Sequence, residues 1–283
     1  LSGQLKGVPK AAVYRMIRTG QVRINGGRAR PASRLQEGDQ VRIPPARTRE
    51  SQETTVSAEV RQQVRQAILH VDRDLMVVNK PAGMAVHAGS GLPWGLIDAL
   101  RQDRPGEYLE LAHRLDRETS GCLVLARNGA ALGHLARQFR DGTVLKYYLC
   151  LLDGRLPEDL VEVDAPLSRT DAESRGPVEV NDDGKQARTR FRLLQRYRHC
   201  SYVEAELLTG RTHQIRAHAK HLGMPLAGDS KYADREAVKR WKGRGLGRLF
   251  LHAHRLGLAA QSGEELEFNA PLPDPLREVL DRL

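Results

Sequence analysis

The sequence predicts a two-domain α+β protein. A compact basic segment comes first, a polar stretch without apolar periodicity follows it, and from about residue 64 short apolar runs typical of strands alternate with amphipathic stretches typical of helices. The chain has 283 residues and is 40% hydrophobic, enough for one large core or two domains. We expect a first domain over residues 1–45, a flexible linker over 46–63 and a second domain over 64–283.

In the first segment a helix and a hairpin are expected. Val13, Met16 and Ile17 recur at helical spacing, and Gly20 follows as a helix end. Residues 25–27, Asn-Gly-Gly, are a strong turn signal between two short alternating strands.

The second segment contains four apolar runs that read as strands and three stretches that read as helices. The strands are expected at 75–78, 122–126, 145–152 and 202–208, and the helices around 132–139, 212–222 and 276–283. Residues 186–193 alternate as a further strand, with arginines at 188, 190 and 192 on one face. That face could contact RNA or simply meet solvent.

The most informative stretch is residues 113–121, His-Arg-Leu-Asp-Arg-Glu-Thr-Ser-Gly, which leads directly into the apolar run 122–126. Its acid, Asp116, lies beside a strand that is expected to be buried, where an unpaired charge is costly. Such an acid either completes a structural network or performs chemistry. These nine residues by themselves favour the structural role.

The composition indicates a polyanionic partner. Lys and Arg total 45 against 35 Asp and Glu, which gives a formal net charge of +10. Arg forks onto phosphates and stacks on bases, so the balance suits a nucleic acid; a solvated basic surface without a ligand is the other explanation.

The sequence gives no sign of a membrane, a secretion signal or a metal. No apolar run approaches the roughly 18 residues of a membrane-spanning helix, and three widely spaced cysteines in apolar stretches are typical of buried thiols in a reducing compartment. His218 with His221, and His252 with His254, lack zinc-site spacing. We therefore expect a cytoplasmic protein with no membrane contact and no bound metal.

Four motifs resemble those of one known family. The 113–121 block, the turn Asn-Lys-Pro-Ala-Gly at 79–83, Lys-Tyr-Tyr-Leu at 146–149 and Leu-Thr-Gly-Arg-Thr-His-Gln-Ile-Arg at 208–216 occur in the order found in the RluA-type pseudouridine synthases. These enzymes isomerise uridine in folded RNA. The resemblance spans nearly the whole chain and is strongest to the branch that acts on the large ribosomal subunit.

The resemblance implies a mixed, mainly antiparallel sheet with a catalytic cleft along its middle. It also implies roles for five residues: Asp116 as the catalytic aspartate, Tyr148 stacked on the target base, Arg216 paired with Asp116, Arg114 in contact with RNA where the base has left, and Lys80 shaping the pocket floor. The residues alone say less. An aromatic in a strand is more often core, Lys80 reads as an exposed lysine in a turn, and Arg216 lies at the flank of a helix stripe, from where it could reach a carboxylate.

The implied substrate is 23S rRNA, and the implied reaction is an isomerisation of uridine to pseudouridine on a flipped-out nucleotide. No cofactor is expected, because the reaction has no net redox change or hydrolysis. We expect a monomer.

Residues 9–44 resemble the later part of an S4 RNA-binding domain, in which a helix and a hairpin grip RNA phosphates. The candidate RNA-binding residues are Lys10, Arg15, Arg18, Arg23, Arg28 and Arg30.

Two alternatives remain open at the level of sequence. A non-catalytic RNA-binding or ribosome assembly protein would share the basic composition and the S4-like segment, but it has no need of a buried acid, which would repel phosphate. A glycosidase needs a second acid across the bond, and nothing places Glu118 there.

Overall fold

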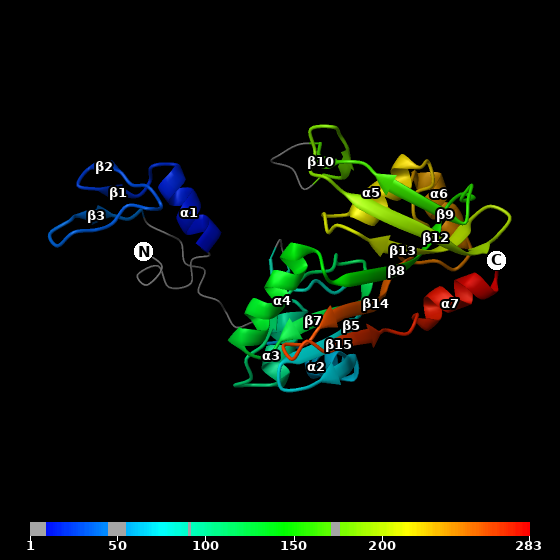
Figure 1. Ribbon diagram of the computed structural model, residues 1–283, viewed down its shortest axis with the longest axis horizontal. Coiled ribbons are helices and arrows are strands. Elements are labelled where there is room, and N and C mark those ends of the chain that lie inside the picture. Colours follow the sequence, from blue (N-terminus) through cyan, green and yellow to red (C-terminus); the bar gives the residue numbers. More distant parts are fainter. Residues whose placement is uncertain (1–9, 45–54, 90–91, 171–175) are drawn as a thin grey trace. The chain divides into compact units, whose positions relative to one another are not determined.

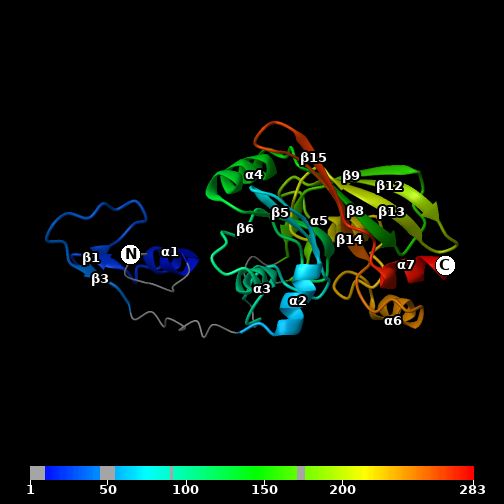
Figure 2. The same ribbon diagram turned by 90° about the horizontal axis from the view of Figure 1, so that it is seen from below.

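The computed structural model describes residues 10–44, 55–89, 92–170 and 176–283. The chain folds as two compact units, Leu1–Thr55 and Val56–Leu283, and each is described by itself (Figures 1 and 2).

The first unit is a helix beside a small antiparallel sheet. Val13, Ile17, Val22 and Ala29 form its core, so the predicted helix face is confirmed. Asn25 and Gly26 both have positive φ, which is the backbone that the predicted two-residue hairpin turn requires. Its elements are α1 (Lys10–Arg18), β1 (Arg23–Ile24), β2 (Gly27–Arg28) and β3 (Val41–Arg42), in sheet order β2-β1-β3.

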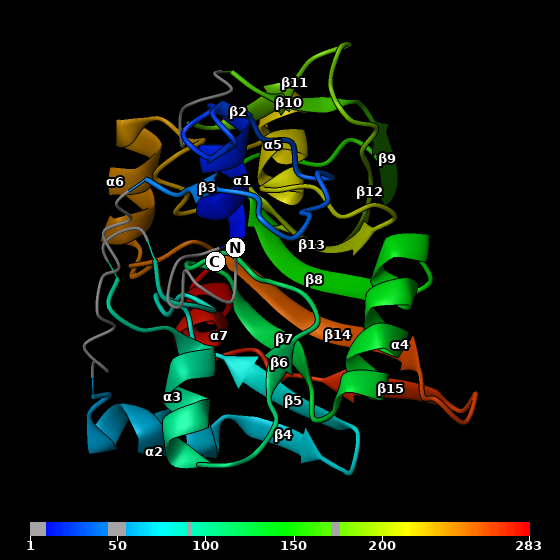
Figure 3. The same cartoon turned by 90° about the vertical axis from the view of Figure 1, so that its left-hand side faces the viewer.

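The second unit is built on one ten-stranded sheet. Its main path runs β4-β5-β7-β14-β8-β13-β12-β9, with β15 beside β14 and β6 beside β7 (Figure 3). Only the pair β7–β14 is parallel among these ladders, which confirms a mixed, mainly antiparallel sheet. The strands are β4 (Ile68–Val71), β5 (Leu75–Lys80), β6 (Glu110–Leu111), β7 (Ser120–Ala126), β8 (Leu145–Leu152), β9 (Leu160–Asp164), β12 (Arg188–Arg196), β13 (Ser201–Leu207), β14 (Leu251–Ala259) and β15 (Glu265–Asn269).

Two further strands and six helices complete the described part of this unit. The strands β10 (Leu167–Arg169) and β11 (Val178–Val180) form a separate hairpin. The helices are α2 (Ala58–Gln66), α3 (Leu96–Asp103), α4 (Gly129–Asp141), α5 (Gln214–His221), α6 (Arg235–Gly243) and α7 (Asp274–Asp281).

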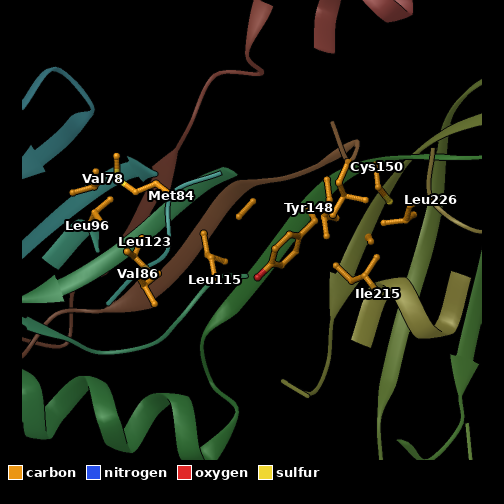
Figure 4. Packing of buried hydrophobic residues seen from close by; sticks show 14 of the residues in the cluster. Val78, Met84, Val86, Leu96, Leu115, Leu123, Tyr148, Cys150, Ile215 and Leu226 are labelled. Atoms are coloured by element: carbon orange, nitrogen blue, oxygen red, sulfur yellow. The ribbon is translucent and has the colours of Figure 1, made fainter. Parts of the chain in front are cut away.

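The two halves of the sheet meet where β7 runs beside β14. Gly121 in β7 has φ +115°, and a Cβ atom there would lie 2.2 Å from the carbonyl oxygen of Ala253. Only glycine allows this approach. The largest hydrophobic cluster continues through this junction, from Val78 and Leu123 on one side to Tyr148 and Ile215 on the other (Figure 4).

The predicted linker over residues 46–63 is wrong in its second part. Residues 46–54 lie outside the described residues, but α2 begins at Ala58, with Ser57 as its N-cap, and the second unit begins at Val56 rather than at residue 64. Val56 and Val64 are buried in the main cluster, and these contacts hold the segment in place although its other side chains are mostly polar.

The arginine face of β12 is confirmed and is occupied by ion pairs. Arg190 pairs with Glu162 and Glu206, and Arg192 pairs with Glu204, all from neighbouring strands. The face is therefore largely neutralised by acids of the same sheet.

The cysteines and the paired histidines are structural in the described part of the chain. Cys122, Cys150 and Cys200 are buried free thiols. His218 contacts Thr189 and the Ala165 carbonyl within the core. No cluster of metal-binding side chains occurs among the described residues, and none of their helices has the length and apolarity to cross a membrane.

Candidate active site

A cavity of about 690 Å³ opens along the middle of the sheet. It is lined by the loop before β7, by β8, by the end of α4 and by residues 207–216. Asp116, Tyr148, Arg216 and Arg114 all line it, so four of the five residues predicted around the reaction lie together. The Asp116 side chain is 22% exposed, so a ligand can reach its carboxylate.

The loop that carries Asp116 is held by a hydrogen bond within it and by an anchor at its far end. Within it, the backbone N–H of Thr119 donates to the Asp116 carbonyl. At its far end Ser120 accepts a hydrogen bond from Arg248 and contacts Nδ1 of the buried His252. His252 in turn contacts the carbonyl of Ala270 through Nε2, so the loop is anchored in the core.

Lys80 lies behind the cavity, not at its mouth. It is fully buried, and its Nζ donates to the carbonyls of Pro81, Met84 and Arg117. The sequence interpretation as an exposed lysine is therefore wrong. Burial lowers the pKa of Lys80 to about 7. The three carbonyl acceptors tie the turn after β5 to the residue that follows Asp116, and the Gly83 N–H to Arg117 carbonyl bond adds to this link.

Arg216 has a partner that the sequence did not reveal. Its Nε and Nη2 each donate to a carboxylate oxygen of Asp229 at 2.7 Å, while its Nη1 lies 3.9 Å from Oδ2 of Asp116. Asp229 is fully buried and raises the pKa of Arg216 against the opposing effect of burial. The pair with Asp229 therefore fixes the position from which Arg216 reaches Asp116, the second acid that it contacts.

Asp229 could have been found from one sequence signal. It closely follows the apolar run 225–227, and an acid in that position needs a buried partner. Gly228 before it has φ +74°, and a Cβ there would meet the Arg248 carbonyl at 2.2 Å, so the turn requires glycine.

His213 is the other residue that sequence reasoning missed. Its Nε2 lies 3.7 Å from the same Oδ2 of Asp116, and its Nδ1 lies 2.9 Å from the Tyr232 hydroxyl. It occupies the N-cap position of α5, with positive φ and no capping bond from its side chain.

Tyr148 forms one wall of the cavity. It is 9% exposed, belongs to the main hydrophobic cluster, and its ring lies between Leu115 and Ile215 in Figure 4. Burial and the nearby Asp116 raise the pKa of its hydroxyl, which keeps it neutral. An aromatic ring beside a carboxylate in an open cavity is suited to hold a planar base.

The rim of the cavity is basic. Arg114, Lys146 and Arg211 line it, together with Arg140, which forms an ion pair with Asp141 of the same lining. Lys146 lies two residues before Tyr148 on β8 and so on the same face of the strand. Burial lowers its pKa, and no acid of the described residues lies within ion-pair distance of it.

The S4-like candidates lie in the first unit. Arg18, Arg23, Arg28 and Arg30 are exposed there, with Arg23 donating to the Gly26 carbonyl and Arg28 to the Arg18 carbonyl. Lys10 and Arg15 belong to α1, and their side chains lie outside the described part of the structure.

Comparison with known proteins assigns the family. Residues 74–221 match the RNA pseudouridylate synthase family, and residues 3–41 match the S4 domain. The chain is 43% identical over 288 residues to Ribosomal large subunit pseudouridine synthase C of Pasteurella multocida, covering 100% of this chain and 88% of that protein. It is 45% identical over 285 residues to the protein of the same name from Yersinia pestis, covering 99% of this chain and 89% of that protein.

The chain belongs to the RNA pseudouridylate synthase family. The solved structure of Human RNA Pseudouridylate Synthase Domain Containing 4 has a similar fold, with a TM-score of 0.66 and 28% identity over 79% of this chain and 95% of that one. The solved structure of Human RNA Pseudouridylate Synthase Domain Containing 1 is also similar, with a TM-score of 0.63 and 32% identity over 73% of this chain and 83% of that one. The family membership confirms the enzyme interpretation against the non-catalytic alternative.

Proposed function

We propose that this pseudouridine synthase isomerises specific uridines of 23S rRNA, with Asp116 as the catalytic residue. The observation that carries the proposal is a half-buried carboxylate in an open cavity, held on one side by Arg216 and faced by the ring of Tyr148. The names of the two relatives above refer to the large ribosomal subunit, and this supports the choice of substrate.

The proposed reaction requires the target nucleotide to leave its helix or loop and enter the cavity. The uracil ring then stacks on Tyr148, where a base–aromatic contact contributes about 1 to 3 kcal/mol. Asp116 promotes cleavage of the N1–C1′ bond, the uracil turns within the cavity, and a C5–C1′ bond forms. The C5 proton is lost and N1 gains one, so atoms balance without a cofactor.

The other residues have supporting roles in this proposal. Arg216 offsets the burial of the Asp116 charge and fixes its direction. Arg114, exposed on the rim, contacts RNA at the place that the base has left. Lys80 holds the backbone beside Asp116 through the Arg117 carbonyl.

We further propose that the S4 unit grips RNA phosphates through Lys10, Arg15, Arg18, Arg23, Arg28 and Arg30. We also propose that the protein acts as a monomer. A cytoplasmic location follows if ribosomal RNA is the substrate.

The deciding experiment incubates 23S rRNA with the protein and maps pseudouridine by carbodiimide-blocked primer extension. Asp116→Asn should abolish modification while RNA affinity stays within about twofold, because the two side chains have the same shape. Glu118→Gln is the matched control, since this exposed acid lies in the same loop. Full activity of the Asp116→Asn protein would refute the assignment of the catalytic residue.

A further inference from the structure

The backbone at His213 indicates that its side chain does more than maintain local structure. His213 and Asn25 are the only non-glycine residues with positive φ in the described part of the chain. A left-handed backbone costs a residue with a β-carbon roughly 1 to 2 kcal/mol. His213 also occupies the N-cap of α5, where Ser, Thr, Asp or Asn would each satisfy a helix N–H, yet it makes no such bond. Both features indicate that the imidazole is held for its contacts.

The hydrogen bonds of Tyr232 fix the tautomer of that imidazole. The Tyr232 hydroxyl oxygen accepts a hydrogen bond from the Val178 backbone N–H at 2.8 Å, and it lies 2.9 Å from Nδ1 of His213. The hydroxyl oxygen already accepts from Val178, so we assign its hydrogen to Nδ1 and take Tyr232 as the donor. In the neutral ring the proton then resides on Nε2.

That proton points at the proposed catalytic carboxylate. Nε2 of His213 lies 3.7 Å from Oδ2 of Asp116, and Nη1 of Arg216 lies 3.9 Å from the same oxygen. Both distances are longer than a hydrogen bond, and contacts of this kind in catalytic sites commonly shorten in the complex with substrate. No hydrogen bond of the described residues reaches Oδ1, so two donors converge on one oxygen and leave the other open.

Burial is the main influence that favours the neutral form of the ring. Burial lowers the pKa of His213, and Arg216 and Lys231 lower it further, against Asp116 and Asp229, which raise it. A neutral ring preserves the Tyr232 bond, because protonation at Nδ1 would remove its acceptor.

We propose that His213 is a positioning residue of the active site, which holds Oδ2 of Asp116 through its Nε2–H so that Oδ1 is presented to the bound nucleotide. The histidine acts through the carboxylate and does not itself contact the reacting atoms. This role rests on the proposed function of Asp116.

Two substitutions separate this role from a purely structural one. In His213→Asn the amide occupies the place of Nδ1: it can keep the hydrogen bond to Tyr232 and tolerates the left-handed backbone, but it is too short to reach Asp116. In His213→Gln the amide nitrogen occupies the place of Nε2, so the donor to Asp116 is kept and the hydrogen bond to Tyr232 is broken. If His213 has only a structural role, His213→Asn should keep more activity than His213→Gln. If His213 positions Asp116, His213→Gln should keep more.

The test measures kcat and KM on a 23S rRNA fragment that contains a modified uridine, together with RNA affinity and melting temperature. We expect kcat to fall about 10- to 100-fold in His213→Asn, the effect of removing a hydrogen bond to a charged group, and several-fold less in His213→Gln. KM and RNA affinity should change less than about threefold in both variants. A kcat for His213→Asn equal to or above that for His213→Gln would overturn the proposal, as would an unchanged kcat in both.

Asp116→Asn in the same assay distinguishes the two levels of inference. If Asp116→Asn is inactive and the Asn and Gln variants rank in the reverse order, the role of His213 fails while the proposed function stands. If Asp116→Asn is fully active, the proposed function fails and the role of His213 fails with it.

Discussion

At the scale of single residues, the buried Arg216 contacts two acids, Asp229 and Asp116. Asp229 takes the bidentate contact with Arg216 and is fully buried, while Asp116 takes the longer contact and keeps access to the cavity. A bidentate pair has a fixed geometry, so Arg216 cannot turn to enclose Asp116. The pair with Asp229 therefore leaves the Asp116 carboxylate accessible from the cavity, as its proposed catalytic role requires.

This arrangement predicts the effect of Asp229→Asn. The change leaves a buried arginine with a neutral partner, which should lower the free energy of unfolding by about 3 kcal/mol. Arg216 is then free to form a bidentate pair with Asp116, so kcat should fall at least tenfold. Urea unfolding and single-turnover rates measure the two effects. Glu236→Gln, an exposed acid on α6, is the control, and a wild-type rate in Asp229→Asn would contradict the argument.

His252 predicts a dependence of stability on pH. Burial lowers its pKa from 6.5 to about 4, so the folded protein binds this proton less readily than the unfolded chain does. The stability from the neutral ring is complete above pH 6.5 and is lost as the pH falls towards 4, at most roughly 3 kcal/mol over that range.

Urea unfolding between pH 4.5 and 7.5 tests this dependence. His252→Gln should have a flatter profile than the wild type, whereas His87→Gln, an exposed histidine, should follow it. Parallel profiles for wild type and His252→Gln would show that the ring titrates normally.

The sequence revealed the residues of the site that belong to motifs and missed those that matter through contacts. Asp116, Arg216 and Tyr148 were expected near one another, and the structure places all three on one cavity. For Asp229, the sequence offers the position after the apolar run 225–227 but not its partner, Arg216. His213 was missed because its contact with Asp116 joins α5 to the loop before β7, and no spacing rule encodes that distance. Lys80 was misjudged because three backbone carbonyls satisfy a buried lysine, and a sequence gives no measure of that.

At the scale of elements, the junction of β7 and β14 decides whether the cavity exists. Asp116 precedes β7, Tyr148 is in β8, and β14 lies between these strands. The two residue pairs of the parallel ladder, His252 with Ser120 and Ala253 with Gly121, set their spacing.

Gly121→Ala should therefore destabilise the protein by several kcal/mol or prevent folding. The new methyl group would meet the Ala253 backbone, and φ +115° is strained for alanine. Gly133→Ala in α4 is the matched control: nothing lies within 4 Å of its Cβ position, and alanine in a helix should raise stability by up to about 1 kcal/mol. Equal melting temperatures for the two variants would contradict the role given to the junction.

Elements with a clear apolar period were predicted well, and polar ones were not. β8 has the predicted bounds, and the helix expected around 132–139 is α4, which ends at Gly142 with φ +75°. α2 was taken as linker because its nine residues include only two large apolar side chains, Val60 and Val64. Their packing against the main cluster stabilises this helix, and that packing is a tertiary effect.

At the scale of the whole molecule, a net charge of +10 does not say where RNA binds, because many arginines are paired with acids. Arg188, Arg190, Arg192 and Arg196 on β12 all lie within 3.5 Å of a Glu or Asp. Arg18, Arg23, Arg28 and Arg30 of the S4 unit are exposed, and none of them forms an ion pair with the described residues. Only a cation without an acid partner is free to neutralise a phosphate.

The two sets of four arginines give a test at equal charge. Replacing the S4 set by Gln should weaken binding to 23S rRNA and reduce the slope of log affinity against log salt by about 0.7 to 0.9 for each phosphate that the protein no longer neutralises. Replacing the β12 set changes the net charge equally but should alter the slope by less than the value for one phosphate, because each of those arginines already has an acid partner. Filter binding from about 50 to 300 mM salt, the range in which counterion release changes affinity strongly, measures both. If the two variants show the same reduction in slope, RNA responds to the total charge of the protein, and the S4 unit has no special part in binding it. Unequal slopes with an unchanged kcat at saturating RNA would separate RNA binding by the S4 unit from the reaction proposed at Asp116.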